Sequence, residues 1–243
     1  GRHILWNNNY EYIFDYADYF EAIIVATDRQ NRILTQQLNK DTEIKTIPVG
    51  YINKISQNHT YKPFSMITAS RLAIEKHIDV LIKATVIAKT KLPSLTLDIY
   101  GEGGERSKLE ALIKKYDAGN FIKLCGHQDL SKIYEHYSLY ISASTSEGFG
   151  LSLLEAMGAG LPQIGVDVDY GNREFIQNGH NGLLFEKVDL QPMPYVMSES
   201  IVSFYERHLD ETGRKVAKLK AKAYLKQNVA SMWSDLLEKG SEA

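Results

Sequence analysis

The sequence has a single cysteine, Cys125, among its 243 residues. An internal disulfide is therefore excluded, and the apolar run FIKLCG around this cysteine predicts a buried small side chain rather than a nucleophile. Basic residues number 28 and acidic residues 30, so no overall charge would recruit nucleic acid or an anionic membrane. A chain without disulfides fits a reducing, cytoplasmic location.

Long apolar runs are also missing. No stretch approaches the roughly 20 apolar residues that cross a bilayer, and the opening residues GRHILWNNNY lack the apolar core of a signal peptide. We therefore expect no transmembrane segment, and any membrane contact to be peripheral, through a partner. Apolar residues still make up 44% of the chain, which is ample for the core of a globular protein.

Several motifs of enzyme chemistry are absent. The sequence has no cluster of cysteine and histidine for zinc and no GxSxG elbow of a hydrolase. The segment that starts at Gly101 begins like the dinucleotide fingerprint GxGxxG, but Arg106 occupies the position of its third glycine. A nicotinamide-dependent dehydrogenase is therefore disfavoured.

Short apolar runs alternate with polar, periodic segments along most of the chain, as in a parallel sheet covered by helices. The runs are AIIVAT, IKTIPVG, FSMITAS, LTLDIYG, FIKLCG, LYISAST, QIGVDV and GLLF. Six of them lie between Phe64 and Phe185, enough for a complete α/β domain with a doubly wound, Rossmann-like parallel sheet. The ligand of such a domain binds at the carboxyl ends of the strands.

Three segments are expected along the chain. Residues 1–52 offer one or two strands, too few for a core of their own, and are interpreted as the end of a preceding domain with a linker. Residues 53–208 form the Rossmann-like domain. Residues 209–243 are largely helical, and their apolar stripe of Trp233, Leu236 and Leu237 predicts contact with another surface.

The segment EGFGLSLLE places two carboxylates, Glu147 and Glu155, eight residues apart around the aromatic Phe149. It follows a strand-like run and opens into a helix. The backbone N–H groups near Phe149 and Gly150 would have no partners within that helix, so they can bind an anionic ligand. The pattern favours a site for a sugar nucleotide; the alternative is an ordinary strand-turn-helix whose acid complements the helix dipole.

Two cations, Arg71 and Lys76, follow the strand FSMITAS and so belong to the edge of the sheet where the ligand is expected. The arginine fork and the lysine point charge together suit a diphosphate and can neutralise a departing nucleoside diphosphate without a metal. The alternative is a solvated helix start in which Glu75 is the partner.

The triplet Asp167-Val168-Asp169 matches the DxD pattern that holds a divalent metal in some sugar transferases. It ends a strand instead of lying in an isolated loop, and Arg71 and Lys76 already supply the charge for the phosphates. We therefore expect neither a metal site nor another cofactor.

Glycines mark two further strand ends. Gly101 and Gly103 predict a turn in which the backbone approaches a ligand, and a plain strand-to-helix turn is an equal interpretation. Gly126 and His127 end the next strand and are candidates to border a base, although a structural or surface role is the default for a single histidine.

The ordered set RLAIEK, IYGEGG, EGFGLSLLEAMGAGLP and GNREFIQNGHNGLLF resembles the C-terminal, donor-binding half of retaining glycosyltransferases with the GT-B fold. In that family the first Glu of the EX7E element lies against the donor sugar and the second contacts the ribose. The resemblance assigns these roles to Glu147 and Glu155. It also implies backbone contacts to sugar and phosphate from Phe149, Gly150 and Leu151.

The same resemblance places the diphosphate on Arg71 and Lys76. Together with Glu147, these two residues are the expected catalytic set, in which Glu147 orients the sugar rather than attacking it. The base-flanking segment of the family matches Gly126 and His127.

More narrowly, segments such as WNNNYEYIF, ITASRLAIEKHIDVLIKA and STSEGFGLSLLEAMGAGLP, spread over about residues 4–190, are similar to the accessory Sec glycosyltransferases of serine-rich repeat adhesins. The resemblance implies transfer of N-acetylglucosamine from UDP-N-acetylglucosamine to Ser/Thr of a serine-rich protein, with retention. The related enzymes that decorate wall teichoic acid are the alternative. These motifs do not separate the two acceptors, because the acceptor-facing surface belongs mainly to the N-terminal domain of the fold.

That N-terminal domain is expected to be mostly absent, since His3 does not fit the histidine motif that these families carry there. The chain thus resembles a truncated enzyme whose exposed surface calls for a glycosyltransferase partner subunit or for self-association. A non-catalytic partner subunit is the competing class, although such a subunit would not need Arg71, Lys76, Glu147 and Glu155 together.

Overall fold

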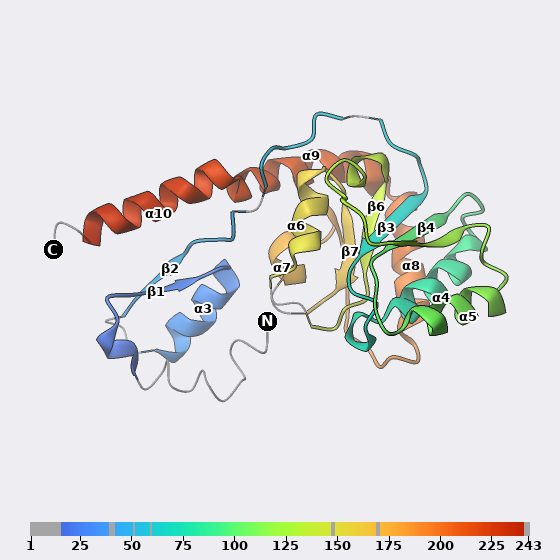
Figure 1. Ribbon diagram of the computed structural model, residues 1–243, viewed down its shortest axis with the longest axis horizontal. Helices are drawn as coiled ribbons and strands as arrows, with labels where there is room; N and C mark the ends of the chain where they lie inside the picture. Colours follow the sequence, from blue (N-terminus) through green and yellow to red (C-terminus); the bar gives the residue numbers. More distant parts are fainter. Residues whose placement is uncertain are drawn as a thin grey trace.

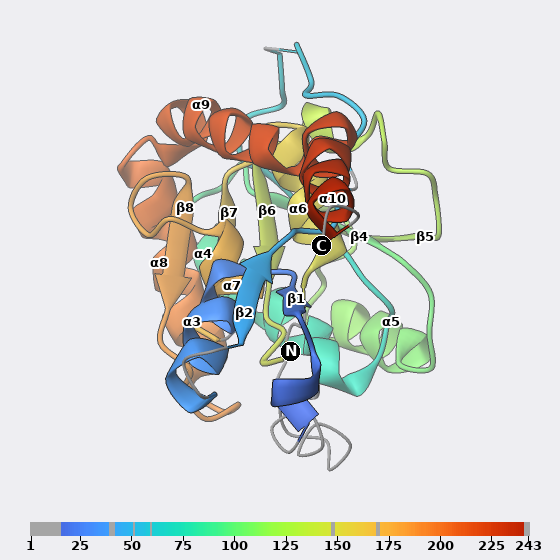
Figure 2. The ribbon, with the colours of Figure 1, turned by 90° about the vertical axis from the view of Figure 1, so that its left-hand side faces the viewer.

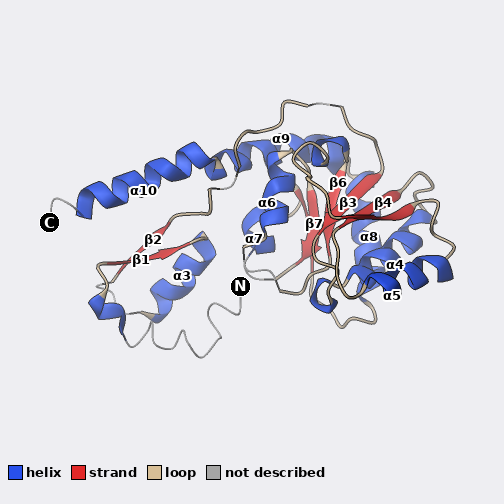
Figure 3. Cartoon of the chain, viewed as in Figure 1, coloured by secondary structure: helices blue, strands red, loops and turns tan. Residues whose placement is uncertain are grey.

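A computed structural model of the chain describes residues 16–38, 42–50, 52–58, 60–146, 149–168 and 171–240. Figure 3 shows a large sheet surrounded by helices and, beside it, a small second sheet. A long C-terminal helix extends from the large sheet toward the small one. The candidate site lies in the larger part.

Six parallel strands form the main sheet, in the order β5-β4-β3-β6-β7-β8. Their bounds are β3 Ser65–Ala69, β4 Thr96–Tyr100, β5 Ile122–Gly126, β6 Leu139–Ser142, β7 Gln163–Val166 and β8 Gly182–Phe185. From β3 the chain adds β4 and β5 on one side and then returns to pair β6 with the other side of β3. This reversal confirms the predicted doubly wound sheet, and it is the place where such sheets bind ligands.

Helices cover both faces of the sheet (Figures 1 and 2). One face carries α4 Ile78–Lys89, α5 Arg106–Lys115 and α8 Met193–Glu206; the other carries α6 Leu151–Gly158, α7 Gly171–Phe175 and α9 Leu209–Ala221. Met66 of β3 packs in the core under α4 and α8, whereas its neighbour Ile67 packs under α6 and α9. Because both faces are buried, the strands read as continuous apolar runs.

A second sheet consists of two parallel strands joined by one helix. These elements are β1 Ala22–Val25, α3 Asp28–Gln37 and β2 Glu43–Thr46, and the short helix η2 Ala17–Tyr19 precedes them. The Thr27 hydroxyl accepts a hydrogen bond of 3.1 Å from the Gln30 N–H, so it caps α3 as threonine commonly does.

The link back to the main sheet runs through Ile52, whose backbone pairs with Leu225. Leu225 lies between the short helix η5 Lys222–Tyr224 and the last helix, α10 Lys226–Gly240. In Figure 1, α10 extends away from the main sheet above β1 and β2. The expected boundaries near residues 52 and 208 stay predictions.

The predicted apolar stripe lies on α10. Its residues Trp233 and Leu237 are exposed, and Leu236 and Leu237 line a groove of about 620 Å³ together with Tyr19 and Phe20. None of the helices in the described part of the chain is long and apolar enough to cross a membrane.

Candidate functional site

A cavity of about 970 Å³ opens at the carboxyl ends of the central strands. Its walls come from the segments that follow β3, β4, β5 and β6, because these parallel strands all end at the same edge of the sheet. The volume is at the upper end of the range typical of ligand sites, roughly 300–1,000 Å³. The cavity is therefore the candidate ligand site.

Eight residues singled out from the sequence line this one cavity. They are Arg71, Lys76, Gly101, His127, Phe149, Gly150, Leu151 and Glu155. Gly103 and Gly126 are not among the described lining residues, and Glu147 lies outside the described residues. The convergence of separate segments is the strongest structural support for the predicted site, whose individual roles stay predictions.

Arg71 projects from the loop after β3 and is highly exposed, with 78% of its side chain accessible. Its guanidinium forms an ion pair of 3.0 Å with Glu75, the partner expected if the segment were a solvated helix start. Lys76 ends the short helix η3 Ile74–Lys76 and is half-buried. An exposed ion pair contributes little to stability, so Arg71 can exchange Glu75 for a phosphate at small cost.

The glycines after β4 lie where two backbone segments come close together. A Cβ on Gly101, whose φ is +131°, would lie 1.8 Å from the carbonyl oxygen of Ser70, and one on Gly103 would lie 2.4 Å from that of Leu72. The Leu72 N–H donates to the Glu102 carbonyl at 2.9 Å. At both glycines two backbone segments therefore approach each other closely. The predicted contact of Gly101 and Gly103 with a ligand stays a prediction.

Gly126 ends β5 in the left-handed region, with φ at +71°. Its carbonyl accepts a hydrogen bond of 2.8 Å from the Gly101 N–H. The pairing of β4 and β5 thus continues to the rim of the cavity, and Gly126 shapes that rim from behind while His127 lines it.

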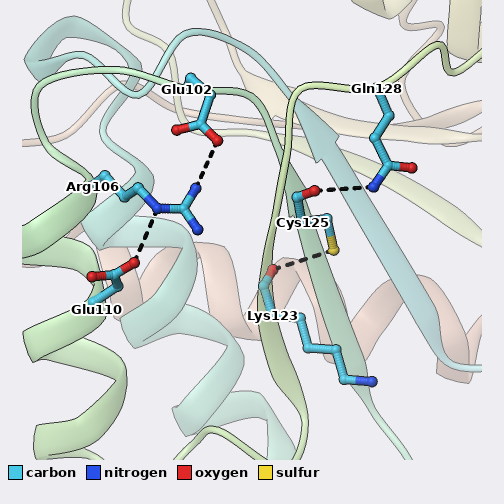
Figure 4. A network of polar contacts seen from close by, with 6 residues as sticks. All are labelled: Glu102, Arg106, Glu110, Lys123, Cys125 and Gln128. Carbon is cyan, nitrogen blue, oxygen red and sulfur yellow. Dashed lines mark hydrogen bonds and ion pairs between the residues drawn. The ribbon is translucent and has the colours of Figure 1, made fainter.

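Figure 4 shows the polar contacts beside this rim. Glu102 lines the cavity, and its carboxylate pairs with Arg106 at 2.9 Å; Arg106 also pairs with Glu110 at 3.0 Å. Because Arg106 offsets the charge of Glu102, the repulsion between this carboxylate and an anionic ligand is reduced.

Cys125 lies behind the same rim, where Gln128 donates to its carbonyl at 3.0 Å. The side chain is partly exposed, not fully buried as the sequence suggested. Burial nevertheless raises the pKa of its thiol, which disfavours the thiolate and supports the expectation that this cysteine is no nucleophile.

The helix α6 begins at the cavity. Gly150 precedes it in a left-handed conformation, with φ at +83°, and the N–H groups of the first helical turn have no acceptors within the helix. Phe149 packs edge-on against Phe175 of α7, with ring centroids 5.2 Å apart, and lies 6.4 Å from Tyr224. These ring contacts hold in place the segment that leads into α6. The N-terminal end of this helix favours anions.

Glu155 lies one turn along α6 and is half-buried at the cavity. It accepts a hydrogen bond of 3.1 Å from the hydroxyl of Tyr134, which belongs to the short helix η4 Tyr134–His136. The sequence analysis missed Tyr134, because no local spacing joins residues 21 positions apart.

Other lining residues were also missed. They are Ala69, Ser70, Tyr100, Glu102, Gln128, Asp129, Leu130 and Ser152. Each of them lies within three positions of a residue that the sequence did single out, so widening every motif by three positions in both directions would have included them.

One carboxylate of the DxD triplet is engaged in an ion pair. Asp167 forms a two-point ion pair with Arg173, with distances of 2.5 and 3.1 Å. The hydrogen bonds from Arg173 lower the pKa of the Asp167 carboxyl. Asp169 lies outside the described residues, and no cluster of His, Cys, Asp or Glu that could hold a metal occurs in the part of the chain that the structure describes.

Comparison with known proteins places the chain in a family. Residues 52–193 match the glycosyl transferases group 1 family. The chain belongs to this family. The matched region contains the whole cavity lining described above, so the site lies within the part of the chain that defines the family.

Two curated relatives show where the chain lies within the family. It is 45% identical over 243 residues to the UDP-N-acetylglucosamine–peptide N-acetylglucosaminyltransferase GtfA subunit of Streptococcus parasanguinis, with 97% of this chain and 48% of the relative covered. It is 28% identical over 231 residues to the poly(ribitol-phosphate) alpha-N-acetylglucosaminyltransferase of Staphylococcus aureus strain COL, with 93% and 45% covered. The chain spans about half the length of these relatives.

Solved structures agree with the sequence relatives. The fold is similar to the crystal structure of the pneumococcal O-GlcNAc transferase GtfA in complex with UDP and GlcNAc, with a TM-score of 0.86, 43% identity and 96% of this chain and 48% of that chain covered. It is also similar to the crystal structure of the GtfA/B complex, with a TM-score of 0.91, 45% identity and 98% and 49% covered. These matches confirm the expected GT-B class and the resemblance to GtfA-type glycosyltransferases.

The backbone crossing at Gly101 yields a test of the site's architecture. We expect Gly101→Ala to lower the free energy of unfolding by about 2–3 kcal/mol, because its Cβ would meet the Ser70 carbonyl. Gly104→Ala, in the same loop, meets nothing within 4 Å and should stay within about 0.5 kcal/mol of the parent protein. Urea unfolding measures both, and equal stability of the two variants would contradict the crossing.

Proposed function

We propose that the protein is a glycosyltransferase that transfers N-acetylglucosamine from UDP-N-acetylglucosamine to Ser/Thr of a serine-rich repeat protein, with retention. The observation that carries the donor assignment is the meeting of eight predicted residues from separate segments in one cavity. The name of the GtfA relative includes the same donor, UDP-N-acetylglucosamine, and the name of the poly(ribitol-phosphate) enzyme includes the same transferred sugar. Retention and the serine-rich acceptor rest on the family resemblance.

In this proposal the diphosphate of the donor lies between Arg71, Lys76 and the first turn of α6. Loss of UDP leaves an oxocarbenium-like sugar, and the cations and backbone N–H groups stabilise the charge that grows on the departing diphosphate. Glu155 accepts hydrogen bonds from the ribose, and Glu147 orients the sugar. No metal or other cofactor takes part, because two cations supply the charge that a metal would bring.

The uracil base would lie toward the segment after β5. Residues His127, Gln128 and Leu130 line that side of the cavity, and the orientation of Gln128 is held by its hydrogen bond to the Cys125 carbonyl. A partly apolar wall with polar edges suits a pyrimidine.

We expect a further domain or subunit to bring the acceptor to the donor site. The chain spans about half the length of its relatives, and a solved structure similar to it is that of the GtfA/B complex. By analogy we propose a glycosyltransferase partner subunit for this protein.

Transfer to wall teichoic acid is the second candidate. It is supported by the 28% identity to the poly(ribitol-phosphate) enzyme, and the 45% identity to the peptide-specific GtfA subunit makes it the weaker choice. A non-catalytic subunit is the third candidate. It is distinguished from both enzymes by nucleotide binding, which both enzymes require.

The donor site is tested by calorimetric titration with UDP and UDP-N-acetylglucosamine in the presence of EDTA. We expect binding without metal, and we expect Arg71→Ala to weaken it roughly ten- to a hundredfold, because a charge-assisted contact to the diphosphate is lost. Lys108→Ala is the matched control: Lys108 is similarly exposed and paired, with Glu105 at 2.8 Å, but is not among the described lining residues.

Three results would count against this donor site. Unchanged affinity in Arg71→Ala would remove that residue from the diphosphate, and a loss of affinity in EDTA would require a metal. A folded protein that binds neither nucleotide would give the lead to the non-catalytic subunit.

Acceptor choice calls for a separate assay. With the partner subunit present, we expect radiolabelled N-acetylglucosamine to pass from UDP to a serine-rich peptide and not to poly(ribitol phosphate). Replacing every Ser and Thr of the peptide by Ala is the control and should abolish labelling. Preferential labelling of the polymer would overturn the peptide acceptor in favour of teichoic acid.

A further inference from the structure

Tyr134 lies behind the carboxylate that is expected to meet the ribose. Its side chain is 2% exposed, yet it borders the cavity, and its hydroxyl donates a hydrogen bond of 3.1 Å to Oε2 of Glu155. The ring is packed in the core under α6 and lies tilted against the ring of Tyr140, with centroids 6.2 Å apart. A buried ring of this kind has few rotamers available, so the position of its hydroxyl is fixed.

The turn that carries Tyr134 is itself anchored. The guanidinium of Arg214, a residue of α9 that is 7% exposed, donates to the carbonyls of Tyr137 at 2.9 Å and Glu135 at 3.4 Å. The Ser56 hydroxyl also contacts the Glu135 carboxylate. Two separate elements therefore hold this turn in place, and with it the donor of the hydrogen bond to Glu155.

Tyr134 also joins two walls of the cavity. Its backbone N–H donates to the carbonyl of Leu130 at 3.3 Å, and Leu130 belongs to the wall after β5. Its hydroxyl reaches Glu155 on α6, in the wall after β6. The same residue thus sets the spacing between the side proposed for the base and the side proposed for the ribose.

A glutamate that recognises a ribose must keep one rotamer. An unrestrained side chain loses conformational entropy when it is ordered on binding, which weakens affinity. A carboxylate offers about four lone-pair positions, so a hydrogen bond from Tyr134 is compatible with others from ribose hydroxyls.

We propose that Tyr134 is a positioning residue that holds the Glu155 carboxylate toward the ribose and so gives the protein its selectivity for a ribose with free hydroxyls. This inference rests on the proposed function. It assigns a role to Tyr134 in donor binding. That role can be measured separately, because selectivity for the ribose hydroxyls is distinct from affinity for UDP.

The test compares UDP with its 2′,3′-dideoxy analogue, by calorimetry on the purified protein and on Tyr134→Phe. The parent protein should bind UDP more tightly than the analogue. We expect Tyr134→Phe to weaken UDP binding roughly three- to tenfold, because Glu155 loses its fixed rotamer. Binding of the analogue should change by less than about twofold, because it has no hydroxyls for Glu155 to hold.

Two further variants separate positioning from general structure. Tyr205→Phe removes another buried hydroxyl, which lies 2.8 Å from the Ser138 hydroxyl in the core under α8, and should leave the UDP preference unchanged. Glu155→Gln should reduce that preference by itself, and adding Tyr134→Phe to it should have little further effect, as expected for two residues that act through one contact.

Equal weakening of UDP and the analogue in Tyr134→Phe would assign the residue a merely structural role and overturn the inference. Unchanged binding of both would overturn it as well. If the parent protein binds neither nucleotide, the proposed donor site fails together with the inference, whereas UDP binding with no preference over the analogue overturns the inference alone.

Discussion

The reversal of strand order at β3 is the constraint on which the candidate site depends. Because β4 and β6 both pair with β3 in parallel, the segments after these strands leave the sheet at one edge and enclose the same space. Backbone hydrogen bonds continue this pairing beyond the strands, from Gly101 to Gly126 and from Leu72 to Glu102. The cavity thus has walls of paired backbone on the β4 and β5 side, and such walls keep their shape without a ligand.

Charged side chains at this edge of the sheet are neutralised in ion pairs. Arg71 pairs with Glu75, Arg106 with Glu102 and Arg173 with Asp167. In our account the first pair differs from the other two in its role: it is highly exposed, so it contributes little to stability and can open when a diphosphate offers Arg71 a stronger partner. The pair at Arg106 reduces the repulsion between the Glu102 carboxylate and an anionic ligand, and the pair at Arg173 engages the Asp167 carboxylate of the DxD triplet.

The sequence predicted the sheet well, because strands buried on both faces are apolar throughout and β3 to β8 therefore stand out from their surroundings. It also brought together Arg71, Phe149 and Glu155, since each follows a strand of the same parallel sheet. It left two readings open at Gly101, because a glycine required by a crossing of two backbone segments looks the same in a sequence as one required by a ligand. It gave no sign of Tyr134, whose contact with Glu155 exists only in the folded chain.

The central claim is that the cavity at the ends of β3, β4 and β6 binds the UDP part of a sugar nucleotide. A crystal structure of the protein with UDP, grown without divalent metal, tests it most directly. Our account predicts the diphosphate within hydrogen-bonding distance of Arg71 and Lys76 and the ribose at Glu155. A nucleotide bound elsewhere, or one that enters this cavity with its ribose away from Glu155, would contradict it.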